Sequence, residues 1–278
     1  MRRQIPLVSR RGCLFCLIGM GAGLGFDGPL APQKTVNPTV KSSADLARDI
    51  AELSHADKDR RANAAVRLGR RGAKAATAVP KLAQITQSDP SSEVRGYAAS
   101  ALGAIGPSAK LGVDALVKAT NDVDSAVARR AIVAIGEIGP NAAAALPVLR
   151  RKLSDPDPNM RRIAARALGG LAESAEPATD ELISRMFNDD DAVVCREAAH
   201  ALGEIGRPVG RVVGALTEVI SDENAALSTR FAAVRAIGVM GPKAKSAADV
   251  LRKVVDDDDT NLATAAKVAL KAVSVGGK

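Results

Sequence analysis

Aromatic side chains are scarce in this sequence. They make up 2% of its 278 residues, with no tryptophan and a single tyrosine, although hydrophobic residues make up 46%. Alanine and the short aliphatic residues must therefore form the core. Small side chains of this kind suit closely packed helices better than the aromatic-rich interior of a β-sandwich or barrel. The charged fraction of 25% is typical of a soluble domain.

Histidine and cysteine are scarce too, which limits the chemistry that the chain can carry out. The two histidines, His55 and His200, lie far apart, and Cys195 is the one cysteine outside the N-terminal segment. These residues cannot assemble a Ser/His/Asp or Cys/His catalytic arrangement. No glycine-rich phosphate-binding loop occurs apart from the repeated glycines described below. We therefore predict that the protein is not an enzyme and uses no cofactor.

A strong excess of charge of one sign is also missing from the sequence after residue 33. The net charge is +8, but residues 1–33 contribute +3 of it, and the remainder has 35 basic and 30 acidic residues. This balance is too mild to indicate nucleic-acid binding.

Residues 1–33 have the pattern of an export signal and a short linker. Arginines precede an apolar run, Cys13–Phe26, which is shorter than the roughly 20 residues that span a bilayer as a helix. The segment SRRGCL, Ser9–Leu14, resembles the twin-arginine signal, with cysteine where that family prefers phenylalanine; general secretion is the alternative route. We expect cleavage, no stable membrane span afterwards, and a location in the bacterial periplasm or cell envelope. Residues 34–42 are predicted to be a linker.

From residue 43 onward the sequence repeats itself every 33 to 35 residues. Each copy carries a motif such as ALGAIG or ALGEIG, and the copies align on their first glycines: Gly69, Gly103, Gly136, Gly169, Gly203 and Gly238. The apolar pattern of each unit predicts two helices. The first helix carries the aligned glycine, and the absence of a side chain there lets a neighbouring helix approach closely. Leu270 continues the column of Leu68 and Leu102, which indicates a seventh, truncated copy. Residues 43–54 predict a lone helix that covers the first end of the stack.

These repeated columns resemble the HEAT repeat, in the short bacterial form of phycobilin lyase subunits, over about residues 43–273. The resemblance implies an all-α, armadillo-type fold over residues 43–278. This fold is an α-solenoid of about six helix pairs and a terminal half repeat, with one set of helices lining a concave surface.

Most HEAT proteins are platforms for other proteins, so the resemblance implies an exported, non-enzymatic scaffold that binds a protein or peptide. A lyase-like or enzyme-accessory subunit is the first alternative, and a nucleic-acid-binding HEAT-like protein is the second. Nucleic acid is not expected as a partner, because few aromatic side chains are present to stack on bases.

Basic residues on the predicted second helices are candidates for partner binding. They are Lys118, Arg150, Arg151 and Lys253. If they line the concave surface, an acidic protein segment could bind there. The alternative is an ordinary solvated helix face.

Three residues of one predicted first helix could together hold a metal ion. Glu197, His200 and Glu204 follow at spacings of three and four, which places them on one helix face. The repeat alignment favours a polar surface instead, because other copies have valine, serine or arginine in the column of His200. Deoxyhypusine hydroxylases, which are HEAT-repeat enzymes, bind metal through His-Glu pairs, and this sequence has no such dipeptide.

Repeated aspartates and arginines are interpreted as structural. Two sets of aspartates are predicted to cap helix N-termini rather than to bind calcium. The first set is Asp57, Asp124, Asp157, Asp191 and Asp259. The second set lies two positions earlier in the repeat and is Asp89, Asp122, Asp155, Asp189 and Asp257. Arginines in one column are predicted to pair with aspartates of neighbouring loops: Arg61, Arg95, Arg161 and Arg230, with Arg129 and Arg196 one place later.

Overall fold

A computed structural model describes residues 43–275. The predicted export signal, 1–33, and linker, 34–42, lie outside the described residues and stay predictions. The chain divides into two units, Met1–Val40 and Lys41–Lys278, and the architecture below is that of the described residues of the second.

Residues 43–275 form helices joined by short turns and loops, and they contain no strand. The single helix α1 (Ser43–Glu52) is followed by six helix pairs, and α14 (Thr260–Ser274) stands alone at the end. The pairs are α2 (Lys58–Arg70) with α3 (Val79–Ser88), α4 (Ser92–Ile105) with α5 (Val113–Ala119), α6 (Ser125–Ile138) with α7 (Leu146–Lys152), α8 (Pro158–Gly170) with α9 (Thr179–Asn188), α10 (Ala192–Ile205) with α11 (Val209–Ser221), and α12 (Leu227–Met240) with α13 (Ala248–Val254). The predicted α-solenoid of six pairs and a half repeat is confirmed.

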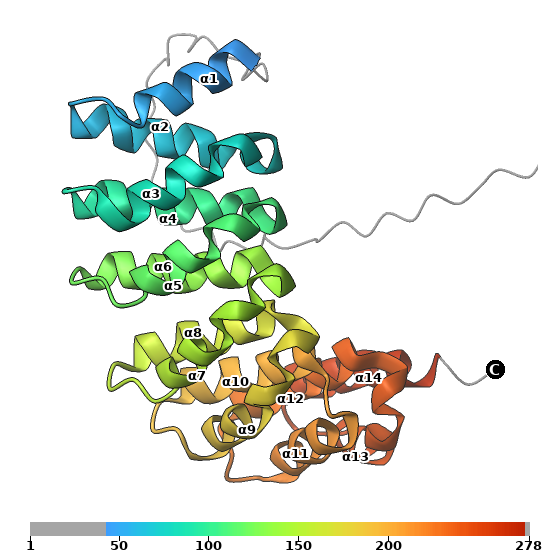
Figure 1. Ribbon diagram of the computed structural model, residues 1–278. Helices are drawn as coiled ribbons and strands as arrows, with labels where there is room; N and C mark the ends of the chain where they lie inside the picture. Colours follow the sequence, from blue (N-terminus) through green and yellow to red (C-terminus); the bar gives the residue numbers. More distant parts are fainter. Residues whose placement is uncertain (1–42, 276–278) are drawn as a thin grey trace, which may run out of the picture. The chain divides into compact units, whose positions relative to one another are not determined.

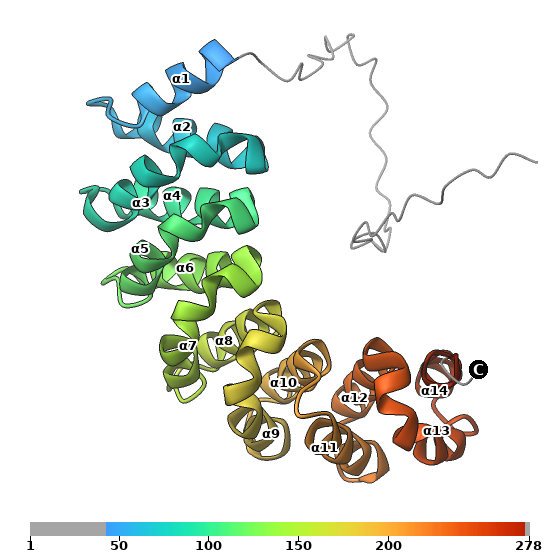
Figure 2. The same cartoon turned by 45° about the vertical axis from the view of Figure 1, so that its right-hand side comes forward.

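The pairs stack in chain order, so that each packs against the one before and the one after (Figure 1). Figure 2 shows that this stack bends within the second unit. The first helices, from α4 through α6, α8, α10 and α12 to α14, lie on the inner side of the bend, and the second helices lie on its outer side.

The repeated glycines mark the closest contacts between neighbouring first helices. A Cβ added at Gly203 would lie 2.7 Å from Cα of Ala236, and one at Gly103 would lie 2.8 Å from Cα of Ala134. A side chain there would push the helices apart, and the same holds at Gly136, where the distance to Cα of Ala167 is 2.9 Å. At the other three glycines the nearest atoms lie at 3.1 to 3.4 Å, so the close packing is confirmed most clearly in the middle of the stack.

A short 3₁₀ segment joins the two helices in five of the pairs, a feature that the periodicity did not predict. These segments are η1 (Gly72–Ala78), η2 (Gly106–Gly112), η3 (Gly139–Ala145), η4 (Ala172–Ala178) and η5 (Gly241–Ala247). Four of them begin with a glycine whose φ is positive, as at Gly106 (70°). The remaining segment, η4, begins instead with Ala172, at a φ of 49° that L-residues rarely adopt.

The first end of the stack is covered by α1, as predicted. Leu53 is fully buried, and Leu46 and Ile50 pack against the core. The sequence did not reveal the role of Asp49, which is 1% exposed and accepts hydrogen bonds at 2.7 Å from both Arg67 and Arg71 of the first pair. This buried carboxylate fixes the covering helix to the solenoid.

One set of aspartates caps helices as predicted. Each side chain accepts a hydrogen bond from a backbone N–H in the first turn of its helix, as Asp57 does from Asp59 at 2.8 Å. The caps are Asp57, Asp124, Asp157, Asp191 and Asp259 at the starts of α2, α6, α8, α10 and α14.

The capping prediction is wrong for the second set. Four of these aspartates pair with the column of arginines, and the fifth, Asp155, pairs with Lys152 at 3.2 Å. The pairs are Arg61 with Asp89, Arg95 with Asp122, Arg161 with Asp189 and Arg230 with Asp257, at 2.7 to 2.9 Å. Each carboxylate of the set also accepts a backbone N–H two residues later, which shapes the loop before the next helix. We call these four pairs the arginine ladder.

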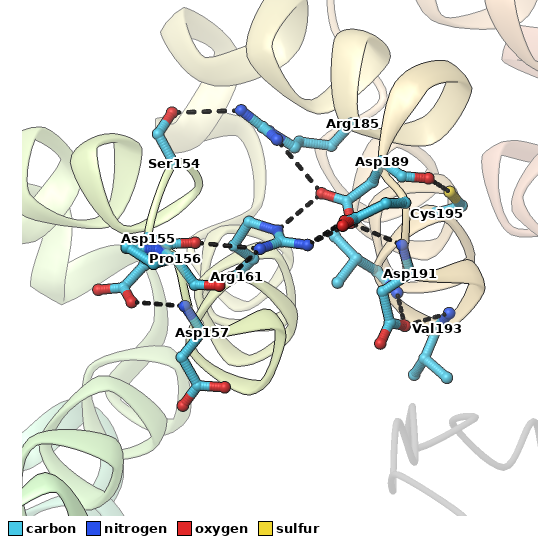
Figure 3. Close-up of polar contacts among 12 residues, drawn as sticks. Ser154, Asp155, Pro156, Asp157, Arg161, Arg185, Asp189, Asp191, Val193 and Cys195 are labelled. Atoms are coloured by element: carbon cyan, nitrogen blue, oxygen red, sulfur yellow. Dashed lines mark hydrogen bonds and ion pairs between the residues drawn. The ribbon is translucent and has the colours of Figure 1, made fainter.

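Figure 3 shows the most buried step of this ladder. Arg161 donates two hydrogen bonds to Asp189, at 2.7 and 2.8 Å, and two more to the carbonyls of Asp155 and Pro156. One guanidinium therefore joins the loop before its own helix to the loop that precedes the next pair.

The ladder is interrupted where its column lacks arginine. Cys195 occupies the place of Arg161 in the next copy, and its thiol donates a hydrogen bond to the carbonyl of Asp189 at 3.3 Å. Burial raises the pKa of Cys195, which keeps the thiol protonated as this bond requires. The two arginines one place later do not join the ladder, contrary to the prediction. Arg129 donates to Ser125 and Arg196 pairs with Glu197, because one residue turns a side chain by roughly 100° around the helix.

One described segment, Ser125–Lys152, is long and apolar enough to cross a membrane by length and composition alone. It comprises α6, η3 and α7, and half of it is buried in the solenoid.

Candidate binding groove

A groove with a volume of about 1050 Å³ opens on the inner side of the solenoid, over α10, α12 and α14. It exists because three consecutive first helices present side chains from corresponding turns to the same surface. Its floor includes the small residues Gly238, Ala269 and Ala272, which leave room between the larger side chains around them.

The groove carries large apolar side chains that the solenoid does not cover. Val268 is 67% exposed, Val239 60% and Leu227 47%, and the half-buried Phe231 lies beside them. Exposed apolar side chains that share one groove make this surface a candidate site of interaction.

Polar groups also line the groove. Asp259 caps the start of α14, and the others lie toward the α10 end, with Arg196 and His200 on α10 and Arg235 on α12. Burial lowers the pKa of His200, opposed by Glu197 and reinforced by Arg235 and Arg196, so the imidazole is neutral at physiological pH. The basic charge at this end is therefore that of the two arginines.

The candidate metal residues do not form a metal site. His200 lines the groove, Glu197 is paired with the neighbouring Arg196 at 3.2 Å, and Glu204 is exposed. Within residues 43–275 no three histidine, cysteine or acidic side chains are grouped closely enough to hold a metal ion.

The predicted partner-binding residues lie on the other side. Lys118 on α5, Arg150 and Arg151 on α7 and Lys253 on α13 are all exposed, and these second helices form the outer side of the bend. The expectation that they line the concave surface is therefore wrong. Arg150 is also occupied by an ion pair with Glu181. Whether these residues bind a partner stays a prediction.

The groove residues themselves were not predicted from the sequence. Phe231, Val239 and Val268 occupy columns that vary from copy to copy, whereas the core columns hold alanine or leucine throughout. A column that varies within an otherwise regular repeat faces solvent, so this variation was the signal. It did not say which of the two helix sets lies inside the bend.

Comparison with known proteins identifies the repeat. The family description of HEAT repeats matches residues 113–180 and 179–271, more than half of the sequence. The chain belongs to the HEAT-repeat family. No curated protein sequence matches it significantly.

Solved HEAT structures show the same fold. The complex of CpcE and CpcF of phycocyanin lyase from Nostoc sp. is similar at 19% identity, covering 88% of this chain and 100% of that chain, with a TM-score of 0.53. The E. coli protein YibA is similar at 24% identity, covering 82% of each chain, also with a TM-score of 0.53. At these identities the likeness concerns the fold, and it supports the predicted similarity to phycobilin lyase subunits at that level.

Proposed function

We propose that this HEAT-repeat protein is a scaffold that binds a protein partner in the groove over α10, α12 and α14. The observation that carries the proposal is the exposure of Leu227, Val239 and Val268 on one concave surface. Burying three such side chains would contribute roughly 1.5 to 3 kcal/mol each if they became fully covered, which is enough to anchor a peptide segment.

A protein segment suits this groove better than a small ligand does. The groove is open along three helices, and it combines an apolar floor with two arginines at one end. Helix pairs stacked into a solenoid provide extended binding surfaces of this type. The CpcE and CpcF structure is a complex of two proteins, which is a precedent for this fold in a protein assembly.

A capture experiment with matched variants tests the proposal. The full-length chain, a groove variant (Val239→Asp with Val268→Asp) and a control variant (Leu111→Asp with Val123→Asp) are used as bait in envelope extract. Leu111 and Val123 are 81% and 99% exposed and do not line the groove, so the control makes the same chemical change elsewhere.

We expect one identified partner to bind both the unmodified chain and the control variant. The groove variant should not capture this partner. Equal capture by all three would refute the groove as the site. A further variant, Lys118→Glu with Arg151→Glu, tests the outer side. Loss of the partner from this variant alone would move the site to the second helices.

We also infer that the protein acts outside the bacterial cytoplasm. The arginines and the apolar run of residues 1–33 support this location. Cell fractionation with an antibody to the solenoid is the test, and recovery of the whole pool in the cytoplasm at full length would contradict it.

A further inference from the structure

We infer that the inner surface next to the groove binds an extended acidic peptide segment through a strip of arginines, an inference that rests on the proposed function and deepens it. The arginine strip consists of Arg129 and Arg130 on α6, Arg162 and Arg166 on α8, Arg196 on α10 and Arg235 on α12. Its last two members line the groove, so strip and groove form one continuous surface.

The strip differs from the arginine ladder in lacking carboxylate partners. Every arginine of the ladder is paired with an aspartate at 2.7 to 2.9 Å. In the strip, by contrast, Arg196 alone forms an ion pair with a carboxylate of residues 43–275, its neighbour Glu197. Arg130 lies over the ring of Tyr97, 4.7 Å from its centroid, and Arg129 contacts a serine.

Arg162 gives an independent sign of a missing ligand. Its side chain is half-buried, and its Nε atom is shielded from solvent without a hydrogen-bond acceptor among the described residues. A buried donor without an acceptor is unfavourable, and a ligand carboxylate that draws the half-buried guanidinium outward would supply the missing acceptor.

The charge of this surface is positive but not uniform. Glu137, Glu197 and Glu204 share the helices of the strip, which leaves six arginines against three glutamates. Burial raises the pKa of Glu137, an effect that the neighbouring Arg166 opposes. A ligand with spaced negative charges fits such a surface better than one with a dense block of charge.

The spacing of the helices sets the pattern of the ligand. Neighbouring packed helices lie about 8 to 10 Å apart, and an extended peptide advances about 3.3 Å per residue. A segment that crosses α6, α8, α10 and α12 would therefore place every third residue over a new helix. We expect acidic residues at every third position, followed by apolar residues that enter the groove.

Single-stranded nucleic acid fits the strip less well. Such ligands are held by stacking on aromatic rings as well as by charge. Tyr97 is already covered by Arg130, and Phe231 lies in the groove rather than along the strip. The strip offers guanidinium groups without free aromatic rings, which favours carboxylates.

The test measures binding of fluorescein-labelled synthetic peptides to the full-length chain by fluorescence anisotropy. The probe peptide has glutamate at every third position, serine between, and a leucine pair at one end; it is made in both orientations. Comparison ligands replace each glutamate by glutamine, move the glutamates into one block, or substitute an oligothymidylate of similar length.

Two variants carry the same change of charge. The strip variant is Arg129→Glu, Arg162→Glu and Arg166→Glu, and the control is Lys118→Glu, Arg151→Glu and Lys253→Glu on the outer side. A milder strip variant with glutamine at the same three positions guards against misfolding, which far-UV circular dichroism checks. We expect the strip variant to bind the probe about tenfold more weakly, as three lost exposed ion pairs would predict, and the control to stay within about twofold.

Several results would overturn the inference. They are equal affinity for the glutamate and glutamine peptides, equal weakening by the control variant, and preference for the glutamate block. Tighter binding of oligothymidylate with the same loss in the strip variant would replace the peptide by nucleic acid. If the groove variant (Val239→Asp with Val268→Asp) alone loses the probe, the groove stands and the strip fails. If the strip variant alone loses it, the strip stands and the groove fails.

Discussion

Replacing Gly203 by alanine is expected to destabilise the solenoid, although alanine is the better helix former. Gly203 is buried in the middle of α10, and an added Cβ would lie 2.6 Å from Cβ and 2.7 Å from Cα of Ala236 on α12. Contacts below 3.0 Å with backbone cannot be relieved by rotating a side chain, so the two helices must separate.

The magnitude is the difference between two opposing effects. Overpacking a well-packed interface costs roughly 1 to 3 kcal/mol, and exchanging glycine for alanine inside a helix returns about 1 kcal/mol. Because the contacts are with Cα of Ala236 and with a Cβ that cannot rotate away from the helix, the cost should lie in the upper part of its range. We expect a net loss of about 1 to 2 kcal/mol.

Gly214 provides the matched control. It lies inside α11, it is exposed, and a Cβ there would meet nothing within 4 Å. Gly214→Ala should therefore stabilise the protein by about 1 kcal/mol. The assay is urea unfolding followed by circular dichroism for both variants. Equal midpoints for the two variants, or a higher midpoint for Gly203→Ala, would refute the close-packing explanation of the repeated glycines.

The remaining predictions concern the ladder, acid stability and one strained loop. Asp189→Ala should cost about 3 kcal/mol in urea unfolding, the low end for removing one partner of a buried pair, because Arg161 then keeps only the exposed carboxylate of Asp190. Glu181→Ala, which breaks an exposed pair with Arg150, should cost less than about 1 kcal/mol, and similar losses in the two variants would contradict the ladder. Burial acts to raise the pKa of Asp189, but hydrogen bonds from Arg161, Asp191 and Arg185 outweigh it, so the pKa is lowered. This aspartate therefore stabilises the fold above about pH 4, and the stabilisation is lost as the pH falls through the lowered pKa. Unfolding midpoints between pH 2 and pH 7 should fall on acidification, and more steeply than in Asp189→Ala; a rise would show that the sign is wrong. Ala172→Gly should raise the melting temperature, with a gain of about 1 kcal/mol, because glycine adopts the positive φ of this position without strain; an unchanged or lower value would argue against strain there.

The sequence allowed the architecture to be predicted because the physical requirements recur in every copy. The glycine at a helix contact, as at Gly103, and the N-cap, as at Asp57, each satisfy a local need that one repeat reveals and the others confirm. The partners of the arginine column followed from the same periodicity, with Arg61 and Asp89 separated by nearly one repeat length.

Features that depend on the arrangement of several repeats were not predictable in this way. The bend of the stack places the first helices inside, and this decided that Val239 and Val268 line the groove while Lys118 and Arg151 face outward. The buried position of Asp49 depends on how α1 packs across the first pair, which a single copy of that helix cannot show.

The most direct test of the account is site-specific photocrosslinking from the groove. A photoreactive phenylalanine analogue is placed at Val239 in one full-length variant and at Leu111, which is 81% exposed outside the groove, in another. We expect the partner to crosslink from position 239, through a segment rich in acidic residues, and not from position 111. Crosslinks from position 111 and none from position 239 would contradict a partner site on the inner side of the solenoid.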